Sequence, residues 1–478
     1  MELLVIDADT GREVRVDPQD LPRIADLLDS SNSGLVLIGL AATPSYWPQA
    51  RRRLAELGAN TLKARYIDAD RDAILLGSRR EEAVSLLVKA WSAFLKAVPR
   101  SPQPRVKVAL NHRVSRRELL RRAPYATLEY TATPLVLSEG CSRLASCRLC
   151  LEACPYNALS EKPPEPDLAR CAECGFCASY CPNEYLWDPT SPRSSLRSFI
   201  EALTSHEPMP ALIVTCSKLR EKLYEKVDKG DTGRAPGVVI YEVSCIASLP
   251  LSRLMYLTYT GVAVFYYCPA DERALCPKRR GADRYFETLR KAANVFKLDY
   301  KAIETLDEAF SGGKALQAPL RDATREDVVR SLAREDGGVE EGLPFYMVRV
   351  SEECTFCGAC VSRCPAEALG VEAAEKYRLL FSHAGCIGCG ECVLACPENA
   401  VQLIGLADAQ LLRSGKHVEV ASSPTARCQL CGRPIGPESM VRRVKERLEE
   451  AFPSSASEAA QLCPECRVKA GLAARNED

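Results

Sequence analysis

The sequence lacks the features that mark several classes of protein. No apolar run approaches the roughly 18 residues that a membrane helix needs, since the stretches 35–42 and 261–267 are only as long as strands. Neither sign of charge is in excess, because 63 Lys and Arg balance 63 Asp and Glu, which argues against a dedicated binder of polyanions. The start, MELLVIDADTG, has no basic segment leading into an apolar stretch, as a secretory signal would. We therefore expect a cytoplasmic location, no membrane insertion and no nucleic-acid partner.

Motifs for common organic cofactors are also missing. We find no G-x-G-x-x-G turn and no P-loop, so flavin, nicotinamide and ATP sites are unsupported. The four histidines, at positions 112, 206, 383 and 417, show no spacing typical of paired metal ligands. His383 lies three residues before Cys386 and could tune a metal site there, although we expect an ordinary surface residue.

What the sequence does contain is 24 cysteines, none of them before residue 141. A reducing compartment keeps thiols reduced, so this number indicates metal binding rather than disulfides. The cysteines fall into four groups, with eight in 141–181, four in 216–276, eight in 354–396 and four in 428–466.

The group at 354–396 contains two runs of the form C-x2-C-x2-C-x3-C-P, the spacing of bacterial two-cluster ferredoxins. Three thiolates on a tight loop can hold one cube of iron and sulfide, while the fourth, expected at the start of a helix, reaches the other cube. Gly358, Gly388 and Gly390 would let backbone amides approach the sulfurs. The two 4Fe–4S clusters are expected on Cys354, Cys357, Cys360 and Cys396, and on Cys386, Cys389, Cys392 and Cys364. Eight inert buried thiols would not explain two copies of one spacing.

The group at 141–181 repeats this pattern with one departure. Its second run matches fully, whereas the first run has five residues instead of two in its first gap. A longer loop can still deliver a ligand, although a degenerate site that has lost one cluster is the alternative. The two 4Fe–4S clusters are expected on Cys141, Cys147, Cys150 and Cys181, and on Cys171, Cys174, Cys177 and Cys154. Both segments thus resemble bacterial-type ferredoxin modules.

The group at 216–276 has no local spacing, but its context is informative. Short apolar runs at 211–215, 238–243 and 261–267 are typical of buried parallel strands, and Cys216, Cys245 and Cys268 directly follow these runs or lie close behind them. Because the carboxyl ends of parallel strands share one sheet edge, we expect these thiols together, with Cys276 on the next loop. Four such thiolates suit a 2Fe–2S cluster. The alternative is a set of strand-end thiols that pack as small apolar groups.

The stretch VSCIASLPLSRLMYLTYTGVAVFYYCPADERALC resembles the delta subunit of methyl-viologen-reducing hydrogenases, over about residues 208–300. This resemblance implies a small α/β domain that holds a 2Fe–2S cluster and passes electrons to heterodisulfide reductase. That family usually has paired or closely spaced cysteines at its first site, whereas only Cys216 is present here, which leaves four ligands and no spare.

The last group consists of two C-x2-C pairs, Cys428 with Cys431 and Cys463 with Cys466. Four thiolates in this arrangement suit a closed structural zinc site, and apolar residues on one face between the pairs predict a helix over 440–452. The stretch RCQLCGRPIG…LCPECR resembles the C-terminal tail of ferredoxin-like subunits of formate hydrogenlyase. Rubredoxin-type iron is the alternative, but the aromatic core of a rubredoxin is missing.

The N-terminal 98 residues alternate apolar strands with amphipathic helices, predicted at 35–40 (strand), 49–57 and 81–98 (helices). The segment LVLIGLAATPSYWPQARRRLAELGAN with YIDADRDAILL resembles the N-terminal domain of the flavin-containing component of heterodisulfide reductase. The resemblance implies a cluster near this turn, but the turn holds Ala41 and Ala42, so we expect a docking or scaffolding domain without metal.

The basic stretch 100–122 is interpreted as a solvated face, or else as a docking patch for an acidic partner. Residues 162–166 and 311–342 are predicted to be loop and linker.

The fold expected is a multidomain α/β and α+β chain. The domains are predicted at 1–135 (α/β), 136–192 (ferredoxin module 1), 205–310 (α/β, resembling the delta subunit), 343–408 (ferredoxin module 2) and 424–475 (zinc-ribbon-like tail). The chain would hold four 4Fe–4S clusters, one 2Fe–2S cluster and one structural zinc. The clusters would form a wire, that is, a series of redox centres through which single electrons pass. The resemblances imply a subunit of an oxidoreductase complex, between a hydrogenase, formate dehydrogenase or heterodisulfide-reductase-like partner and a ferredoxin-type carrier.

Two other functions compete with this one. The chain could itself be a cluster-based disulfide reductase, but it has no adjacent Cys-Cys pair, and we expect no substrate site of its own. A nucleic-acid scaffold that uses the tail and the basic stretch is disfavoured by the neutral net charge, and salt-dependent binding would revive it.

Overall fold

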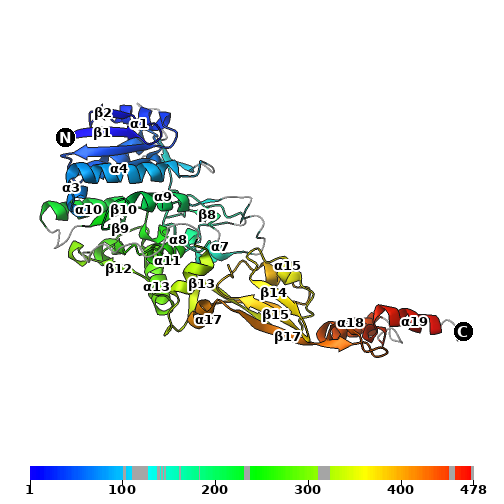
Figure 1. Cartoon of the computed structure of the whole chain (residues 1–478). Coiled ribbons are helices and arrows are strands. Elements are labelled where there is room, and N and C mark those ends of the chain that lie inside the picture. The colour runs from blue at the N-terminus through cyan, green and yellow to red at the C-terminus, as the bar shows by residue number, and fades with distance from the viewer. Residues whose placement is uncertain are drawn as a thin grey trace. The chain divides into compact units, whose positions relative to one another are not determined.

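The computed structural model describes residues 1–100, 104–109, 127–136, 140–141, 144, 147–160, 163–181, 184–230, 237–309, 323–451 and 458–474 (Figure 1). These residues form two compact units. The first comprises residues 1–143, 148–293 and 297–324, and the second comprises residues 144–147, 294–296 and 325–478. None of the helices in the described part of the chain combines the length and the apolar character needed to cross a lipid bilayer.

The first unit begins with a mixed four-stranded sheet in the order β2-β1-β3-β4. Its strands are β1 (Glu2–Asp7), β2 (Glu13–Val16), β3 (Leu35–Leu40) and β4 (Ala64–Asp68). Strand β1 is antiparallel to β2 and β3, whereas β3 and β4 are parallel. The accompanying helices are α1 (Leu21–Ser30), α2 (Tyr46–Glu56), η1 (Thr61–Lys63), α3 (Ala69–Leu76) and α4 (Arg80–Lys96). The predicted strand at 35–40 and both predicted helices are therefore present.

A second sheet of the same unit is entirely parallel, in the order β10-β9-β11-β12. Its strands are β9 (Ala211–Thr215), β10 (Val238–Glu242), β11 (Val264–Tyr267) and β12 (Tyr300–Ile303). Parallel neighbours need crossover connections, and helices supply them here. These connections contain α10 (Ser217–Asp228), η2 (Ile246–Ser248), α11 (Leu251–Tyr259), α12 (Ala270–Ala274) and α13 (Arg279–Val295), and η3 (Leu306–Ala309) follows β12. The three apolar runs predicted as buried strands are β9, β10 and β11.

Aromatic packing joins the two sheets of the first unit. Helix α4 lies against α9 (Arg193–Leu203), as Figure 1 shows. Trp91 of α4 contacts Phe199 of α9 at 4.4 Å between ring centroids and stacks on Tyr241 of the parallel sheet at 5.8 Å. All three rings are buried. The N-terminal sheet is thus packed against the rest of its unit through a shared apolar core.

Between the two sheets of the first unit, the ion pairs centred on Arg220 are also buried. Its side chain is 5 % exposed and contacts Asp72 at 3.3 Å and Glu242 at 3.1 Å. It also donates to the carbonyl oxygen of Tyr66 at 2.7 Å. Since Asp72 and Tyr66 come from the N-terminal part and Glu242 ends β10, one guanidinium ties both sheets together. Buried ion pairs of this kind require that every charge keep its partner.

The first cysteine-rich segment of the same unit has little regular structure. Its short elements are β5 (Val106–Ala109), β6 (Thr127–Tyr130), β7 (Leu135–Val136), α7 (Leu149–Ala153), α8 (Phe176–Ser179) and β8 (Leu186–Trp187). Strands β5 and β6 pair with each other, as do β7 and β8. Of the basic stretch 100–122, residues 101–103 and 110–122 lie outside the described residues.

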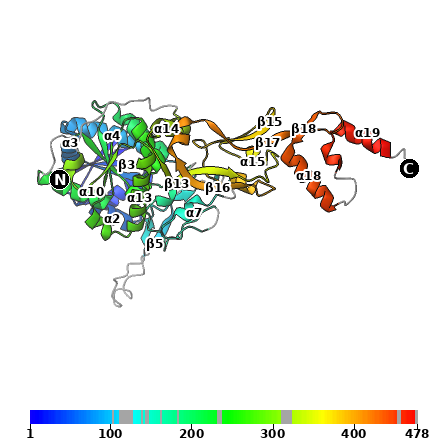
Figure 2. The same cartoon turned by 90° about the horizontal axis from the view of Figure 1, so that it is seen from below.

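The second unit contains two antiparallel sheets, β13-β16 and β14-β15-β17-β18 (Figure 2). Its strands are β13 (Val339–Val350), β14 (Leu369–Ala373), β15 (Lys376–Ser382), β16 (Val401–Asp408), β17 (His417–Arg427) and β18 (Pro434–Pro437). Its helices are α14 (Arg325–Leu332), α15 (Ala359–Ser362), α16 (Glu391–Leu394), α17 (Ala409–Ser414), α18 (Glu438–Ala451), η4 (Glu458–Gln461) and α19 (Pro464–Ala474). Strand β17 pairs with β15 and leads on to β18 and the C-terminal helices.

One prediction about local structure is wrong, and another is confirmed. Residues 311–342 are not all linker, because α14 and the beginning of β13 lie within them, and Val328 and Val329 of α14 are buried. The charged residues that suggested a linker occupy the other positions of the helix. Helix α18 is present where a helix was predicted, but none of its side chains is buried, and Val444 on the predicted apolar face is 42 % exposed.

Candidate metal centres

In the second unit, one predicted quartet surrounds a common cavity. Cys354, Cys357, Cys360 and Cys396 all line it, together with apolar side chains that include Phe356 and Leu379. Burial raises the pKa of Cys360 to about 11, and the neighbouring thiols Cys354, Cys357 and Cys396 contribute to the same shift. The four donors therefore meet at one place although Cys396 is distant in sequence. Thiolates around an apolar pocket are the donor set that a 4Fe–4S cluster requires.

The other predicted quartet of this unit is brought together in the same way. Burial raises the pKa of Cys392 to about 12, with further contributions from the charges of Cys386, Cys389 and Cys364. The two quartets differ in exposure. In this one Cys386, Cys389 and Cys392 are buried, whereas in the first one Cys357 is exposed. The crossed arrangement, in which the fourth cysteine of each run joins the other run, is thus the one that the spacing predicted.

The backbone after the fourth cysteine has the same form in both runs. The N–H of Ala368 donates to Cys364 Sγ at 3.3 Å, and the N–H of Ala400 donates to Cys396 Sγ at 3.2 Å. In each case the third residue after the cysteine is left-handed, with φ of 50° at Glu367 and 51° at Asn399. Such N–H donors to sulfur stabilise a thiolate ligand and influence the potential of the centre it binds.

The position of the fourth cysteine relative to its helix differs from the prediction. Cys364 follows α15 and Cys396 follows α16, so both lie just past the end of a short helix and not at its start. The proline after each cysteine accounts for this, because the residue before a proline is disfavoured in the helical conformation. The third cysteine of each run, Cys360 or Cys392, is the one that lies inside the helix.

The first unit repeats these features around Cys154, Cys171, Cys174 and Cys177. All four line one cavity. Burial raises the pKa of Cys174 to about 12, and the charges of Cys154 and Cys171 contribute. The N–H of Ala158 donates to Cys154 Sγ at 3.4 Å, and Asn157 is left-handed with φ of 48°. The predicted quartet is therefore assembled, with the same backbone at its fourth cysteine as in the second unit.

Three complete runs also share their backbone earlier in the loop. The residue two places after the first cysteine has a positive φ in each, at Glu173, Phe356 and Gly388. The residue after the second cysteine has one as well, at Gly175, Gly358 and Gly390. Only glycine takes this conformation without cost, so its occurrence at Glu173 and Phe356 shows that the loop geometry, and not the residue type, is what repeats.

The run that begins at Cys141 departs from this pattern at a second place. Arg148, which follows Cys147, has a φ of −124° where the other runs are left-handed. Cys141, Cys147 and Cys150 are buried, and Cys150 and Cys181 share an apolar cluster, in which Leu186 N–H donates to Cys181 Sγ at 3.3 Å. Cys147 belongs to the second unit. The quartet of Cys141, Cys147, Cys150 and Cys181 stays a prediction.

The parallel sheet positions the cysteines at 216–276 as expected. Cys216 follows β9, Cys268 follows β11 and Cys245 lies three residues beyond β10, so all three are at the carboxyl edge of adjacent strands. Burial raises the pKa of Cys268 to about 12, with contributions from Cys216 and Cys276. The charge of Cys268 in turn raises the pKa of Cys245, although burial is the larger cause. The edge of the sheet thus gathers four thiols.

A ligand of the first-unit cavity adjoins this sheet edge, which the sequence did not indicate. The charge of Cys174 acts on the thiol of Cys245. Gly281, in the first turn of α13, leaves no room for a side chain, because a Cβ there would lie 2.6 Å from the Cβ and Sγ of Cys174. Nearby, Tyr156 Oη donates to the carbonyl oxygen of Pro277 at 2.8 Å. The sequence signal for this contact is a glycine in the first turn of an amphipathic helix, and a single glycine does not identify what packs against it.

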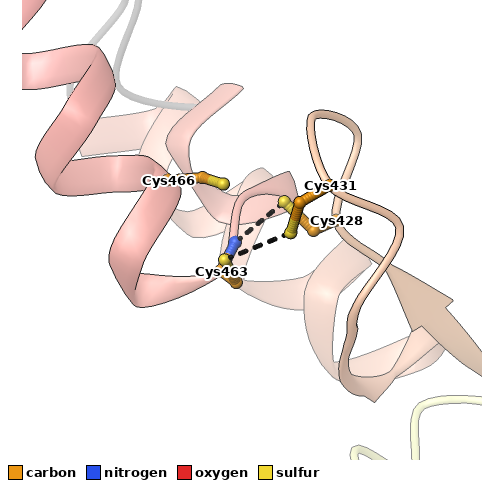
Figure 3. A group of neighbouring side chains, drawn as sticks. All are labelled: Cys428, Cys431, Cys463 and Cys466. Carbon is orange, nitrogen blue, oxygen red and sulfur yellow. Dashed lines mark hydrogen bonds between the residues drawn. The ribbon is translucent and has the colours of Figure 1, made fainter.

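In the tail, the turn after β17 and the start of α19 bring together Cys428, Cys431, Cys463 and Cys466 (Figure 3). Their sulfur atoms all lie within 4.8 Å of one another, and Cys431 Sγ is 3.7 Å from Cys463 Sγ. A hydrogen bond from the backbone N–H of Cys463, at 3.3 Å, is the largest of the causes that lower the pKa of Cys428 to about 6. Four sulfur atoms at this spacing can bind a single metal ion, and an all-sulfur donor set suits zinc or a rubredoxin-type iron.

His383 is not the surface residue that we expected. It is 2 % exposed. Its Nε2 accepts a hydrogen bond from the N–H of Asp408 at 3.2 Å, so Nδ1 carries the proton and donates to the carbonyl oxygen of Tyr346 at 2.9 Å. Burial lowers its pKa, which keeps the ring neutral. The side chain ties β13, β15 and β16 together and has a structural role.

Replacing Gly388 with alanine should destabilise the second unit far more than replacing Gly358. Both residues are left-handed, with φ of 70° and 76°, so each alanine costs roughly 1–2 kcal/mol. At Gly388 the added Cβ would also overlap the ring of Tyr346, whereas a Cβ at Gly358 would meet nothing within 4 Å beyond its chain neighbours. Overpacking adds roughly 1–3 kcal/mol. Denaturant midpoints of the anaerobic protein measure the difference, and equal midpoints for the two variants would contradict the prediction.

Comparison with known families supports part of this description. Residues 353–401 match the model of a 4Fe-4S dicluster domain. The match covers both complete cysteine runs of the second unit and no other part of the chain. No curated protein matches the chain. The second unit therefore contains a ferredoxin-type dicluster domain, which indicates a role in iron–sulfur electron transfer.

Proposed function

We propose that the chain is a multi-cluster electron-transfer subunit of an oxidoreductase complex. In addition to the dicluster domain, a second pair of 4Fe–4S clusters would occupy the cysteines at 141–181, a 2Fe–2S cluster would occupy the sheet edge, and a zinc ion would occupy the tail. The clusters would supply one-electron chemistry. The chain's own residues would bury the clusters and donate N–H groups to their sulfurs.

The observation that carries the proposal is the repetition of one loop geometry in two parts of the chain. The left-handed residues between Cys171 and Cys177 occupy the same positions as those in the matched domain. Cys154 accepts a hydrogen bond from the N–H four residues later, as Cys364 and Cys396 do. The packing of Gly281, five residues after Cys276, against Cys174 supports a further link to the sheet edge. Adjoining centres would exchange electrons without a mobile carrier.

The exposed cysteine Cys357 supports an exchange of electrons with another protein at the matched domain. The partner proposed is a hydrogenase, formate dehydrogenase or heterodisulfide-reductase-like enzyme, with a ferredoxin-type carrier at the other end of the wire. This part of the proposal follows from the resemblances of residues 208–300 and of the tail. Pull-down from anaerobic extracts, followed by identification of stoichiometric subunits, tests it.

Metal analysis of the anaerobically purified chain tests the clusters themselves. Four cubes, one 2Fe–2S centre and one zinc predict about 18 iron, about 18 acid-labile sulfide and one zinc per chain. A value of about 16 iron with one zinc would remove the 2Fe–2S centre. A value of about 8 iron would confine the clusters to the matched domain and contradict the wire. Little iron with several zinc ions would contradict electron transfer altogether.

A further inference from the structure

Lys278 lies between two of the proposed cluster sites. It follows Cys276 by two residues and directly precedes α13. Its Nζ donates to the carbonyl oxygen of Ser244 at 3.1 Å. Because Ser244 is the residue before Cys245, this hydrogen bond fixes the ammonium group beside two of the sheet-edge cysteines at once. The side chain is half-buried, so water screens its charge less than that of a surface lysine.

The segment that carries Lys278 is also held against the first-unit quartet. Tyr156, two residues after Cys154, donates to the carbonyl oxygen of Pro277 at 2.8 Å. Gly281 packs against Cys174 so closely that a Cβ would not fit. Arg284 donates to the carbonyl oxygen of Ala153 at 3.1 Å. These contacts hold the backbone on both sides of Lys278, and the hydrogen bond to Ser244 holds its ammonium group.

The charge of Lys278 acts on thiols from both sites. Lys278 lies close enough to four cysteines for its positive charge to act on them. These cysteines are Cys171 and Cys174 from the first-unit quartet, and Cys216 and Cys245 from the sheet edge. The buried carboxylate of Asp188, to which Ser244 Oγ donates at 3.0 Å, is also influenced by Lys278, while Glu173 and Glu242 oppose the effect of that charge at Cys171 and Cys216. The positive charge of one lysine therefore acts on the cysteines of two proposed sites.

We propose that Lys278 is a counter-charge shared by the two adjoining cluster sites and that it raises the reduction potential of both. This inference rests on the proposed function, because it needs a cluster at each site. A reduced cluster carries one more negative charge than an oxidised one, so a fixed cation between the sites favours the reduced state of each. An electron that arrives at either site then meets the same stabilising charge, so the cation shifts both potentials in the same direction.

The test is a dye-mediated redox titration of the anaerobic full chain, followed by electron paramagnetic resonance. Lys278→Met should lower the equilibrium constant for one-electron reduction about tenfold at both sites, which corresponds to about 59 mV for a one-electron couple. Lys278→Arg keeps the charge and should leave both potentials near those of the wild type. Lys291→Met is the matched control, because Lys291 lies on α13 and pairs with Glu287 at 3.4 Å.

The outcomes separate this inference from the proposed function. If the wild type and Lys278→Met both contain about 18 iron and both potentials fall only in the methionine variant, the inference holds. If neither potential falls, or only one falls, Lys278 is not a shared counter-charge. That result would leave the proposed electron-transfer function unaffected. If Lys278→Arg behaves like Lys278→Met, packing and not charge is responsible, and the inference is wrong. A wild-type chain with about 16 iron would remove the sheet-edge cluster and with it the premise.

Discussion

Replacing Arg220 with methionine should lower the free energy of unfolding of the first unit by about 3–5 kcal/mol. The substitution keeps most of the apolar side chain but removes the charge from a site that is 5 % exposed. Asp72 and Glu242, with side chains 7 % and 9 % exposed, would each lose their contact with that guanidinium. Arg51 still pairs with Glu242 at 2.8 Å, so the larger part of the loss falls on Asp72.

The measurement is the urea midpoint of the anaerobic protein, followed by tryptophan fluorescence, because Trp47 and Trp91 are buried in this unit. Arg197→Met is the control. Arg197 pairs with Glu201 at 3.1 Å, but both side chains are well exposed, and an exposed pair contributes roughly 0–1 kcal/mol. If the two variants shifted the midpoint equally, the buried network would not join the two sheets energetically.

Replacing Cys177 with alanine should remove about four iron and about four sulfide from each chain. Cys177 is a buried member of the first-unit quartet, and burial raises its pKa well above that of a free thiol, with Cys174, Cys154 and Cys171 contributing. Alanine is preferred to serine because a serine oxygen could replace the sulfur as a ligand. Iron and sulfide analysis of the anaerobic protein gives the result directly.

Cys360→Ala is the matched variant, since Cys360 is the third cysteine of its run in the dicluster domain, as Cys177 is in its own. It should cause the same loss of about four iron. A loss in Cys360→Ala with none in Cys177→Ala would show that the first-unit quartet holds no cluster. The repeated loop geometry would then be a remnant of an ancestral module.

The sequence was sufficient for features that depend on spacing along the chain. The exact bounds of β3 and β9 were predicted, because each is a short apolar run that is buried on both faces of its sheet. The crossed quartets of the second unit follow from two copies of one cysteine spacing. In the first unit, the same spacing predicted that Cys154 joins Cys171, Cys174 and Cys177.

Features that depend on contacts between distant segments could not be predicted. Arg220 lies on a charged helix and looks like a surface residue, yet Tyr66, Asp72 and Glu242 enclose it. His383 has no neighbour in sequence that would reveal the partners at Tyr346 and Asp408. In each case a polar side chain is buried because its partners come from other elements, and hydrophobic periodicity carries no record of such partners.

Strand β17 has a consequence for the design of shortened chains. It pairs with β15 from His417 to Pro424 before it continues to the cysteine quartet of the tail. A chain that ended before His417 would leave the backbone N–H and C=O groups of β15 unpaired along that edge. Open edges of this kind recruit strands from other molecules and promote aggregation. A truncation meant to delete only the tail metal site should therefore retain the chain through Arg427, where β17 ends.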